Sequence, residues 1–288
     1  MFTLKQGWAC LFGALMLLGL ILSDRLWNPD WAIARYDASA SAAYQTAMLN
    51  TLVTGTPTGN PPLLIVHGLY GSARNWSVVA VDMRNHGHSF WSDDHSYFAM
   101  ADDLAQIIAA HGGEMDVVGH SMGGKASMVL AVQHPDAVRR LIVADISPVS
   151  YGHSQIQFID AMRKVDLTQV EKRSDAVAQL APHVPDPTLQ SFFTQSLDLK
   201  EKRWRLNLDA LAANMDDILG FPELQGSFEG PTLFLSGADS DYVVPEYRPA
   251  IRALFPKARF AKIPGAGHWL HAEKPREFEA SVRIFLNA

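Results

Sequence analysis

The chain has 288 residues, 48% of them hydrophobic and 19% charged, which is typical of a globular protein and excludes a disordered one. Its 24 basic and 30 acidic side chains give a net charge of −6, so electrostatic attraction does not favour nucleic acid as a partner. A single cysteine, Cys10, excludes an internal disulfide and a metal site built from cysteines. At this length we expect one core with an inserted subdomain.

The first 40 residues form a separate unit, which we expect to be an apolar leader or anchor. Residues 7–22 are almost all apolar, Lys5 precedes them, and the first acidic residue is Asp24. This length matches the hydrophobic region of a signal peptide and is slightly short for a membrane span. The segment predicts a membrane-anchored or exported protein that associates with a membrane through residues 7–22. A mitochondrial or plastid targeting leader and a helix packed on the rest of the chain are the alternatives.

From about residue 49 onward, short apolar runs alternate with amphipathic segments, the pattern of a mostly parallel sheet flanked by helices. The runs at 63–66, 78–81, 116–118, 141–144, 232–235 and 260–263 predict buried strands. Apolar residues at helical spacing predict helices around 100–108, after Ser121 to Gln133, and at 275–287. The predicted fold class is therefore α/β.

Between residues 147 and 226 the strand pattern stops. Helical segments with scattered proline and charge take its place, one of them at 204–215. We expect a cap made only of helices at 147–226, inserted into an α/β core that residues 41–146 and 227–288 form together.

A candidate nucleophile lies at the end of a predicted strand. Residues 119–123 read Gly-His-Ser-Met-Gly and match G-x-S-x-G between a strand and a helix, the context that this motif requires. The two glycines allow a turn tight enough to expose the serine hydroxyl. The hydroxyl then lies at a helix N-terminus, whose dipole favours developing negative charge. This pattern predicts nucleophilic chemistry at Ser121.

A glycine-flanked loop, residues 67–71, directly follows the first buried strand. Backbone N–H groups in such a loop can stabilise an oxyanion. We expect the two donors to be the N–H groups of Leu69 and Met122, and we expect His67 to brace the loop.

The candidate base is His268, which follows the last predicted strand between flanking glycines. In sites of this type the serine comes first in the chain and the histidine last. The acid has two candidate positions, Asp145 after the strand at 141–144 and Asp241 after the strand at 232–235. A carboxylate at either position can orient His268, and spacing alone does not choose between them.

Together these residues resemble one branch of the α/β-hydrolase fold, the YbfF-type bacterial esterases and their mitochondrial abhydrolase-domain relatives. The resemblance rests on HGLYGSARNW (67–76), DMRNHGHS (82–89), GHSMGGK (119–125), VADISP (143–148), WRLNL (204–208) and GHWLHAEKP (267–275). It implies esterase or thioesterase activity without a cofactor. Because members often lack an aspartate in the stretch that matches 237–243, it favours Asp145 as the acid, with Asp241 as the alternative.

The sequence departs from this family in two places. The leader before about residue 40 has no counterpart in the bacterial members, and only residues 67–77 separate two strands that are expected to be parallel neighbours. A parallel crossover normally takes roughly a dozen residues and usually a helix. The short connection predicts either a strained loop that uncovers one face of the sheet or a sequence that lacks a segment here.

The sequence therefore predicts a serine hydrolase that cleaves small-molecule acyl esters or thioesters through an acyl-enzyme on Ser121. Tyr70 and Trp269 suggest an apolar acyl chain. Other reactions of the same fold, such as perhydrolysis or carbon–carbon bond hydrolysis, are alternatives, and so is a non-catalytic binding protein. The histidines at 86, 88 and 95 show no metal-ligand spacing, so we expect no metal site. The oligomeric state is not indicated.

Overall fold

The computed structural model describes residues 48–54, 62–69 and 79–288. The predictions for the leader (1–40), for Tyr70 and for most of the short connection at 67–77 lie outside these residues. Among the described residues, no helix is both long and apolar enough to cross a membrane.

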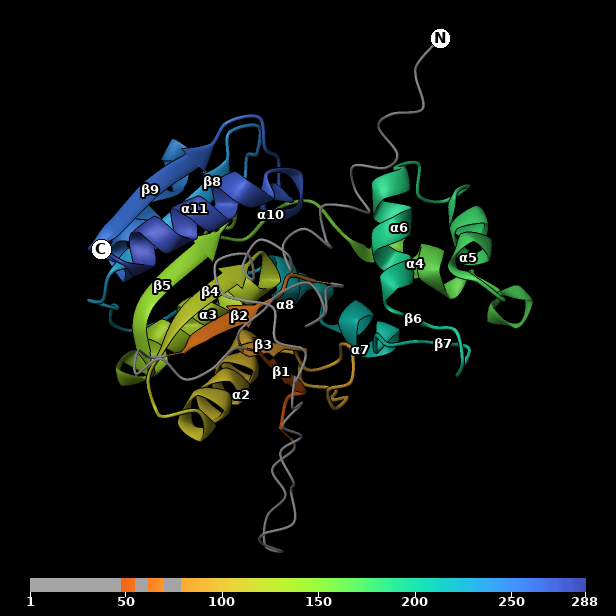
Figure 1. Cartoon of the computed structure of the whole chain (residues 1–288), viewed down its shortest axis with the longest axis horizontal. Helices are drawn as coiled ribbons and strands as arrows, with labels where there is room; N and C mark the ends of the chain where they lie inside the picture. Colours follow the sequence, from red (N-terminus) through yellow and green to blue (C-terminus); the bar gives the residue numbers. More distant parts are fainter. Residues whose placement is uncertain (1–47, 55–61, 70–78) are drawn as a thin grey trace, which may run out of the picture.

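A seven-stranded sheet forms the centre of the molecule (Figure 1), in the order β1-β3-β2-β4-β5-β8-β9. Only β1 pairs in the antiparallel sense, with β3; all other neighbours are parallel. The strands are β1 (Thr51–Val53), β2 (Leu63–Val66), β3 (Val79–Val81), β4 (Met115–His120), β5 (Val138–Ala144), β8 (Thr232–Gly237) and β9 (Ala258–Ile263). The mostly parallel α/β sheet predicted from the sequence is confirmed.

Both faces of the sheet are packed against helices, because alternate strand residues point to opposite sides. One set of strand side chains packs with α2 (Tyr97–Ala110) and α3 (Met122–Gln133), and the other with α10 (Leu270–Glu273) and α11 (Pro275–Leu286). The first set includes Leu64, Val66, Val117, Leu141, Val143 and Phe234, and the second Ile65, Val118, Ile142, Leu233 and Leu235. Among the described residues, the sheet region also contains η2 (Pro135–Ala137), η4 (Pro245–Tyr247) and α9 (Arg248–Leu254).

Strands β2 and β3 are parallel neighbours, as the sequence predicts. Leu64 lies opposite Val79, and Val66 lies opposite Val81. The structure thus bears out the pairing that makes the connection at 67–77 so short, while the connection beyond Leu69 lies outside the described residues.

The segment between β5 and β8 carries most of the helices that are not packed on the sheet. It contains α4 (Ile156–Arg163), η3 (Leu167–Gln169), α5 (Arg173–Leu180), α6 (Pro187–Gln195), α7 (Leu208–Ala213) and α8 (Met215–Leu219). In Figure 1, α4, α5 and α6 lie to the right of the sheet and α7 and α8 lie nearer to it. The limits of a cap at 147 and 226 stay a prediction.

The expectation that this segment is entirely helical is wrong at one place. Strands β6 (Leu197–Asp198) and β7 (Arg203–Trp204) pair as an antiparallel hairpin, so Trp204 begins no helix. The Asp198 carboxylate accepts hydrogen bonds from the backbone N–H groups of Lys200 and Glu201, and the left-handed conformation of Lys202 (φ 48°) completes the turn. A polar side chain that bonds its own following backbone favours a turn over a helix.

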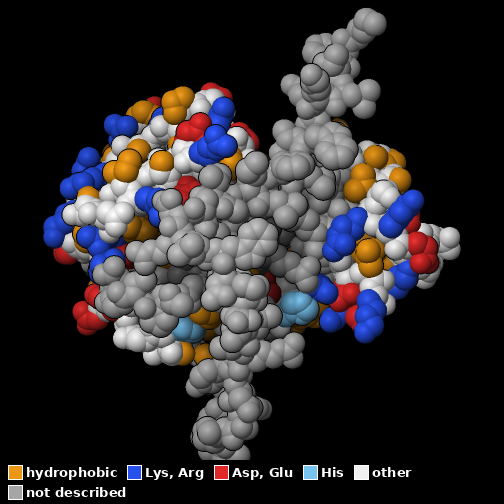
Figure 2. Space-filling view, viewed as in Figure 1, with side chains coloured by type: hydrophobic (Ala, Val, Ile, Leu, Met, Phe, Trp, Pro, Cys, Tyr) orange, Lys and Arg blue, Asp and Glu red, His pale blue; other side chains and the backbone are white. Residues whose placement is uncertain are grey.

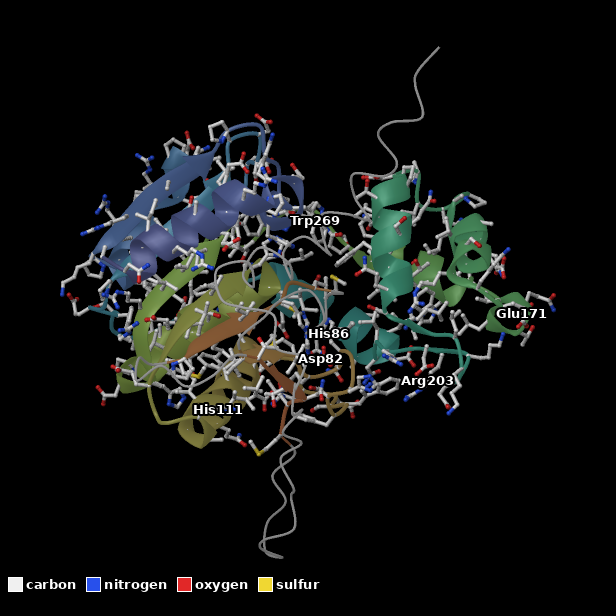
Figure 3. The ribbon with its side chains drawn as sticks, in the orientation of Figure 1. Asp82, His86, His111, Glu171, Arg203 and Trp269 are labelled. Atoms are coloured by element: carbon white, nitrogen blue, oxygen red, sulfur yellow. The ribbon has the colours of Figure 1, made fainter. Side chains whose placement is uncertain are left out.

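Two of the sequence motifs join this segment to the sheet region. The N–H of Gly87 donates to the carbonyl of Arg205 at 2.7 Å, and the N–H of Asn207 donates to the carbonyl of Asn85 at 3.0 Å. His86, which Figure 3 shows between the two regions, is buried and donates from Nδ1 to the Arg84 carbonyl at 2.9 Å. Burial lowers its pKa well below the usual value.

Charged side chains of both signs are interspersed over both regions on the face shown in Figure 2.

A substitution at Gly123 can test the close packing of α3 against β2. A Cβ at this position would overlap the carbonyl oxygens of Val66 and His67, and backbone atoms of a central strand cannot move aside cheaply. We expect Gly123→Ala to lower the free energy of unfolding by about 1–3 kcal/mol, measured by urea denaturation. Gly152→Ala is the matched control, because its Cβ would meet no atom within 4 Å. Equal effects of the two substitutions would contradict this packing.

Candidate active site

The bend between β4 and α3 places Ser121 at the carboxyl edge of the sheet. Ser121 has φ 54° and ψ −121°, a strained backbone for a residue with a side chain. The bend holds because the Ser121 N–H donates to the Ala144 carbonyl of β5 at 3.1 Å, and the Lys125 N–H donates to the Ser121 carbonyl at 3.0 Å. Gly119 permits the crossing, since a Cβ there would overlap the Gly123 carbonyl. The hydroxyl is thereby presented at the N-terminus of α3.

His268 reaches Ser121 from the loop after β9. Its Nε2 lies 3.1 Å from the Ser121 Oγ, and its Nδ1 lies 2.8 Å from Asp145 Oδ2. Because a carboxylate oxygen accepts, Nδ1 carries the proton and Nε2 is left to accept the hydroxyl proton of Ser121. This geometry suits transfer of a proton from the hydroxyl to the imidazole.

Asp145 occupies the first position after β5, beside the strand that ends at Ser121. It is completely buried and has φ 51°. Its Oδ1 accepts from the Gly237 N–H at 3.0 Å, and its Oδ2 accepts from the Ser240 hydroxyl at 2.5 Å as well as from His268. A buried charge requires partners of this kind, and three donors supply them, two from the end of β8 and its loop and one from the loop after β9.

The structure thus brings together Ser121, His268 and Asp145. Asp241, the alternative acid, lies exposed on the loop that follows β8. The carboxyl position next to His268 is already occupied by Asp145.

The two predicted oxyanion donors lie in the same pocket as Ser121. Leu69 and Met122 both line the pocket above it, and Met122 opens α3, where a helix leaves its first N–H groups without intrahelical partners. His67 donates from Nδ1 to the Gly68 carbonyl at 2.7 Å and accepts at Nε2 from the Met83 N–H at 3.0 Å. Burial lowers the pKa of His67, so the neutral ring can fill both roles and brace the loop.

His120 was missed by the sequence analysis, because any residue is allowed at its place in G-x-S-x-G. Its Nε2–H donates to the backbone carbonyl of His268 at 2.9 Å, and its ring lies 4.8 Å from the His268 ring and 4.6 Å from that of His271. Burial lowers the pKa of His120 well below its usual value and that of His271 to about 3. Both rings are therefore neutral near pH 7. His120 packs against the His268 ring and His271 packs against His120, so neither adds charge near the base.

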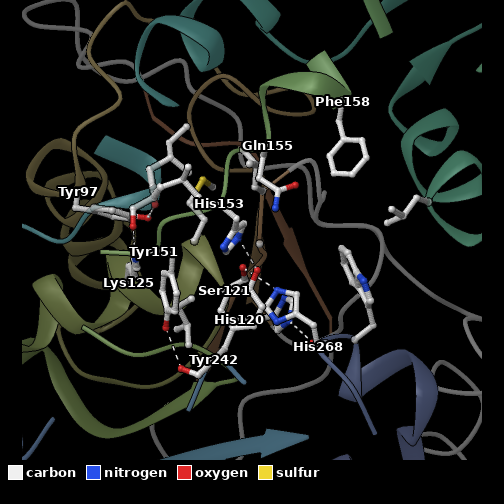
Figure 4. A pocket seen from close by; sticks show the side chains of 18 of the residues that line it. Tyr97, His120, Ser121, Lys125, Tyr151, His153, Gln155, Phe158, Tyr242 and His268 are labelled. Atoms are coloured by element: carbon white, nitrogen blue, oxygen red, sulfur yellow. Dashed lines mark hydrogen bonds between the residues drawn. The ribbon is translucent and has the colours of Figure 1, made fainter. Parts of the chain in front are cut away.

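A pocket of about 660 Å³, including its open mouth, lies over Ser121. Figure 4 shows Ser121 and His268 between two unlike sides of this pocket. One side is apolar and the other is aromatic with a cation. Phe158 lies on the apolar side, where ring contacts lead from it through Phe193 and Phe192 to Trp269. Tyr97, Lys125 and Tyr151 lie on the other side, and Leu189 also lines the pocket. The ring centres of Trp269 and Phe192 of α6 are 4.6 Å apart. The apolar side therefore joins the loop after β9, which carries Trp269, to the helices between β5 and β8 (Figure 3).

Lys125 is a buried cation that ties α3 to the end of α8. Its Nζ donates to the carbonyls of Leu219 and Gly220 at 2.8 and 2.6 Å and lies 4.8 Å from the ring centre of Tyr151. Burial lowers its pKa from 10.5 to about 7. This role could not be predicted from the sequence, since the two carbonyls lie far from Lys125 along the chain.

This depressed pKa predicts a pH-dependent stability. Between pH 7 and 10.5 the unfolded chain binds the Lys125 proton and the folded chain releases it, so the free energy of unfolding rises with pH across this window. Lys125→Met removes the titrating group. We expect the stability of the wild type relative to Lys125→Met to increase between about pH 7 and pH 9.5, measured by urea denaturation. Lys164→Met, at an exposed lysine, is the control and should show a constant difference. A flat or falling difference for Lys125→Met would contradict the burial argument.

Comparison with known proteins identifies the fold family. A family model described as the alpha/beta hydrolase fold matches residues 61–275, and a model of a protein family of unknown function matches residues 1–59. A mouse protein named sn-1-specific diacylglycerol lipase ABHD11 is 42% identical over 78% of this chain and 81% of its own length. Esterase YbfF of Escherichia coli is 36% identical over 79% and 94%. A solved structure titled marine microorganism esterase has a TM-score of 0.78 and 35% identity, and covers 83% of this chain and 100% of its own.

The parallel sheet with a serine on the bend after its central strand defines a serine hydrolase. The chain belongs to the α/β-hydrolase fold family, and within it to the branch of the YbfF and ABHD11 esterases. It is a carboxylic ester hydrolase, and the resemblance found in its sequence motifs is confirmed.

Proposed function

We propose that Ser121, His268 and Asp145 are the catalytic triad of this esterase, and that it hydrolyses acyl esters or thioesters through an acyl-enzyme on Ser121. The observation that carries the proposal is the continuous hydrogen-bonded chain from Ser121 Oγ through His268 to Asp145, with distances of 3.1 and 2.8 Å. The dense set of donors on Asp145 supports its role as the acid.

The reaction follows from this arrangement. His268 Nε2 takes the hydroxyl proton as Ser121 Oγ attacks the acyl carbonyl, and Asp145 stabilises the imidazolium that forms. His268 then gives the proton to the leaving alcohol or thiol as the tetrahedral intermediate collapses to the acyl-enzyme. A water molecule, deprotonated by the same imidazole, attacks the acyl-enzyme and releases the acid while the proton returns to Ser121.

The tetrahedral intermediate carries a negative charge on the former carbonyl oxygen. We assign its donors to the N–H groups of Leu69 and Met122, which line the pocket together with Ser121. Each donor of this kind contributes on the order of 3 kcal/mol to transition-state stabilisation, and the N-terminus of α3 favours the same charge.

The apolar side of the pocket supports an acyl chain as the substrate's larger part. Phe158, Leu189 and Phe193 come from helices between β5 and β8 and line the pocket together with Ser121. Mouse and zebrafish relatives are named as diacylglycerol lipases, and the acyl chains of such lipids would fit this lining. Perhydrolysis, carbon–carbon bond hydrolysis and a non-catalytic binding role are not favoured, because the relatives of 35% identity or more are named as esterases or lipases.

Membrane attachment, export or organelle targeting through residues 7–22 stays a prediction. It is supported by the apolar run in the sequence alone.

The two candidate acids can be separated by substitution. Asp145→Asn leaves the imidazole without the carboxylate that selects its tautomer, so we expect kcat on a p-nitrophenyl ester to fall on the order of 10⁴-fold. The kcat of Ser121→Ala should fall at least as far. Asp241→Asn is the matched control, because it makes the same substitution at an exposed aspartate. This variant should keep the wild-type kcat. Loss of activity in Asp241→Asn with activity retained in Asp145→Asn would overturn the assignment.

The length of the substrate's acyl chain tests whether the apolar side of the pocket binds that chain. Each CH₂ that becomes buried contributes about 0.8 kcal/mol, so kcat/KM should rise by up to about fourfold per CH₂ until the pocket is filled. Leu189→Trp fills part of the lining and should lower kcat/KM for long-chain esters much more than for acetate esters. Thr188→Trp, on the exposed side of the same helix, should leave the long-to-short ratio unchanged. Rates that do not depend on chain length would contradict an acyl-chain site.

A further inference from the structure

The cationic side of the pocket takes no part in the reaction proposed above. Tyr97, Lys125 and Tyr151 lie there, with Ser121 and His268 between them and the apolar side (Figure 4). We propose that Lys125 binds an anionic group on the leaving alcohol of the substrate, a carboxylate held a few bonds from the ester oxygen. The substrate class is then an acyl ester of a short hydroxy acid. This inference rests on the proposed function, because it assumes that Ser121 attacks an acyl ester.

Lys125 is a buried charge without an acidic partner. The residue is only 1% exposed, and among the described residues no carboxylate forms an ion pair with it. Its Nζ donates to the carbonyls of Leu219 and Gly220 and lies 4.8 and 5.8 Å from the ring centres of Tyr151 and Tyr97, so these partners are all neutral. Buried charges in proteins are ordinarily paired. A substrate carboxylate would supply the missing partner.

The ammonium group has a donor left for such a ligand. It carries three N–H groups, and two of them are used by the carbonyls at the end of α8. Among the described residues, the third has no hydrogen-bond acceptor, and Lys125 lines the pocket that holds Ser121. A carboxylate oxygen that accepts from this third N–H would form a charge-assisted hydrogen bond.

The two tyrosines beside Lys125 do not compete for the same role. The Tyr97 hydroxyl donates to the Ile218 carbonyl at 2.6 Å, and the Tyr151 hydroxyl donates to the Tyr242 carbonyl at 2.9 Å. Burial raises the pKa of both tyrosines, so both are neutral near pH 7. Of the three side chains, Lys125 is therefore the one that can attract an anion.

The spacing along α3 limits the size of the leaving alcohol. Ser121 is the N-cap of α3, and the four residues from there to Lys125 advance about 6 Å along the helix. Side chains four residues apart lie on the same face of a helix. Because the apolar side takes the acyl chain, the leaving alcohol lies toward Lys125. A short hydroxy acid, with its carboxylate a few bonds from the ester oxygen, spans this distance.

Binding an anion and holding α8 in place are separable roles of Lys125. A lysine that only holds the carbonyl end of α8 supports the shape of the pocket, so its loss changes the rates on all esters alike. A lysine that binds the leaving alcohol acts on an ester with a carboxylate and not on its neutral analogue. The quantity that distinguishes the two roles is the ratio of kcat/KM for an anionic ester to kcat/KM for a neutral one.

The test uses the full-length protein and two esters with the same acyl group, p-butyryloxybenzoate and the neutral p-butyryloxybenzamide. Lys125→Gln keeps an N–H donor for the α8 carbonyls and removes the charge, whereas Lys125→Met removes both. In each variant we expect the anionic-to-neutral ratio of kcat/KM to fall on the order of 10- to 100-fold, the effect of losing a hydrogen bond to a charged group. Lys164→Met, at an exposed lysine, is the matched control and should keep the wild-type ratio. Assays below pH 7 keep most of Lys125 protonated, since its pKa is about 7.

Inhibition of the wild type gives a second measurement that needs no variant. Benzoate should inhibit hydrolysis of p-nitrophenyl butyrate competitively, at concentrations roughly tenfold or more below those at which benzamide inhibits. Equal inhibition by benzoate and benzamide would overturn the inference, also in the case that neither Lys125 variant folds.

The outcomes separate this inference from the proposed function. An unchanged ratio in folded Lys125→Gln and Lys125→Met, with Ser121→Ala inactive on both esters, would overturn the anion site and leave the proposed function standing. Activity retained in Ser121→Ala would overturn the proposed function itself.

Discussion

The buried carboxylate of Asp145 is the group on which the arrangement of the site depends. An ionised carboxylate without solvent must be surrounded by donors, and these come from the end of β8, from the loop that follows it and from the loop after β9. Satisfying one charge thus brings together the end of β5, the end of β8 with its loop, and the loop after β9. The N–H of Asp145 donates a hydrogen bond to the Leu235 carbonyl, and the carbonyl of the preceding residue, Ala144, accepts one from the Ser121 N–H. The acid and the nucleophile are therefore fixed relative to one another by the neighbouring strands β5 and β4.

The pocket depends on a second buried charge. Lys125 lies one helical turn beyond Ser121 on α3, and its ammonium group holds the carbonyl end of α8. Since α8 closes the segment that supplies the apolar lining, the helix that presents the nucleophile also sets one edge of the pocket over it. The backbone pairing of 85–87 with 205–207 holds the same segment from the other side. Substrate binding and nucleophile geometry are in this way built on one rigid unit.

Much of the fold and part of the site could be predicted from the sequence, and the reasons are local. The buried strands show as apolar runs, and G-x-S-x-G carries its own strand-to-helix context, so the sheet and the position of Ser121 follow from short stretches of chain. The acid did not follow in this way. Asp145 and Asp241 lie after neighbouring strands, β5 and β8, so both were compatible with the spacing, and only the family resemblance favoured Asp145. The β6–β7 hairpin was missed because two-residue strands have no periodicity to read. His120 and Lys125 were missed because their roles lie in contacts with residues distant in the chain.

The central claim is that the Ser121 hydroxyl is activated by the imidazole that Asp145 orients. It is tested most directly by reaction with a fluorophosphonate, followed by digestion and mass spectrometry of the labelled peptide. The account predicts a single phosphonyl group on Ser121, no labelling of Ser121→Ala, and much slower labelling of Asp145→Asn. Folded protein that does not react, or that carries the label on another residue at the wild-type rate, would contradict it.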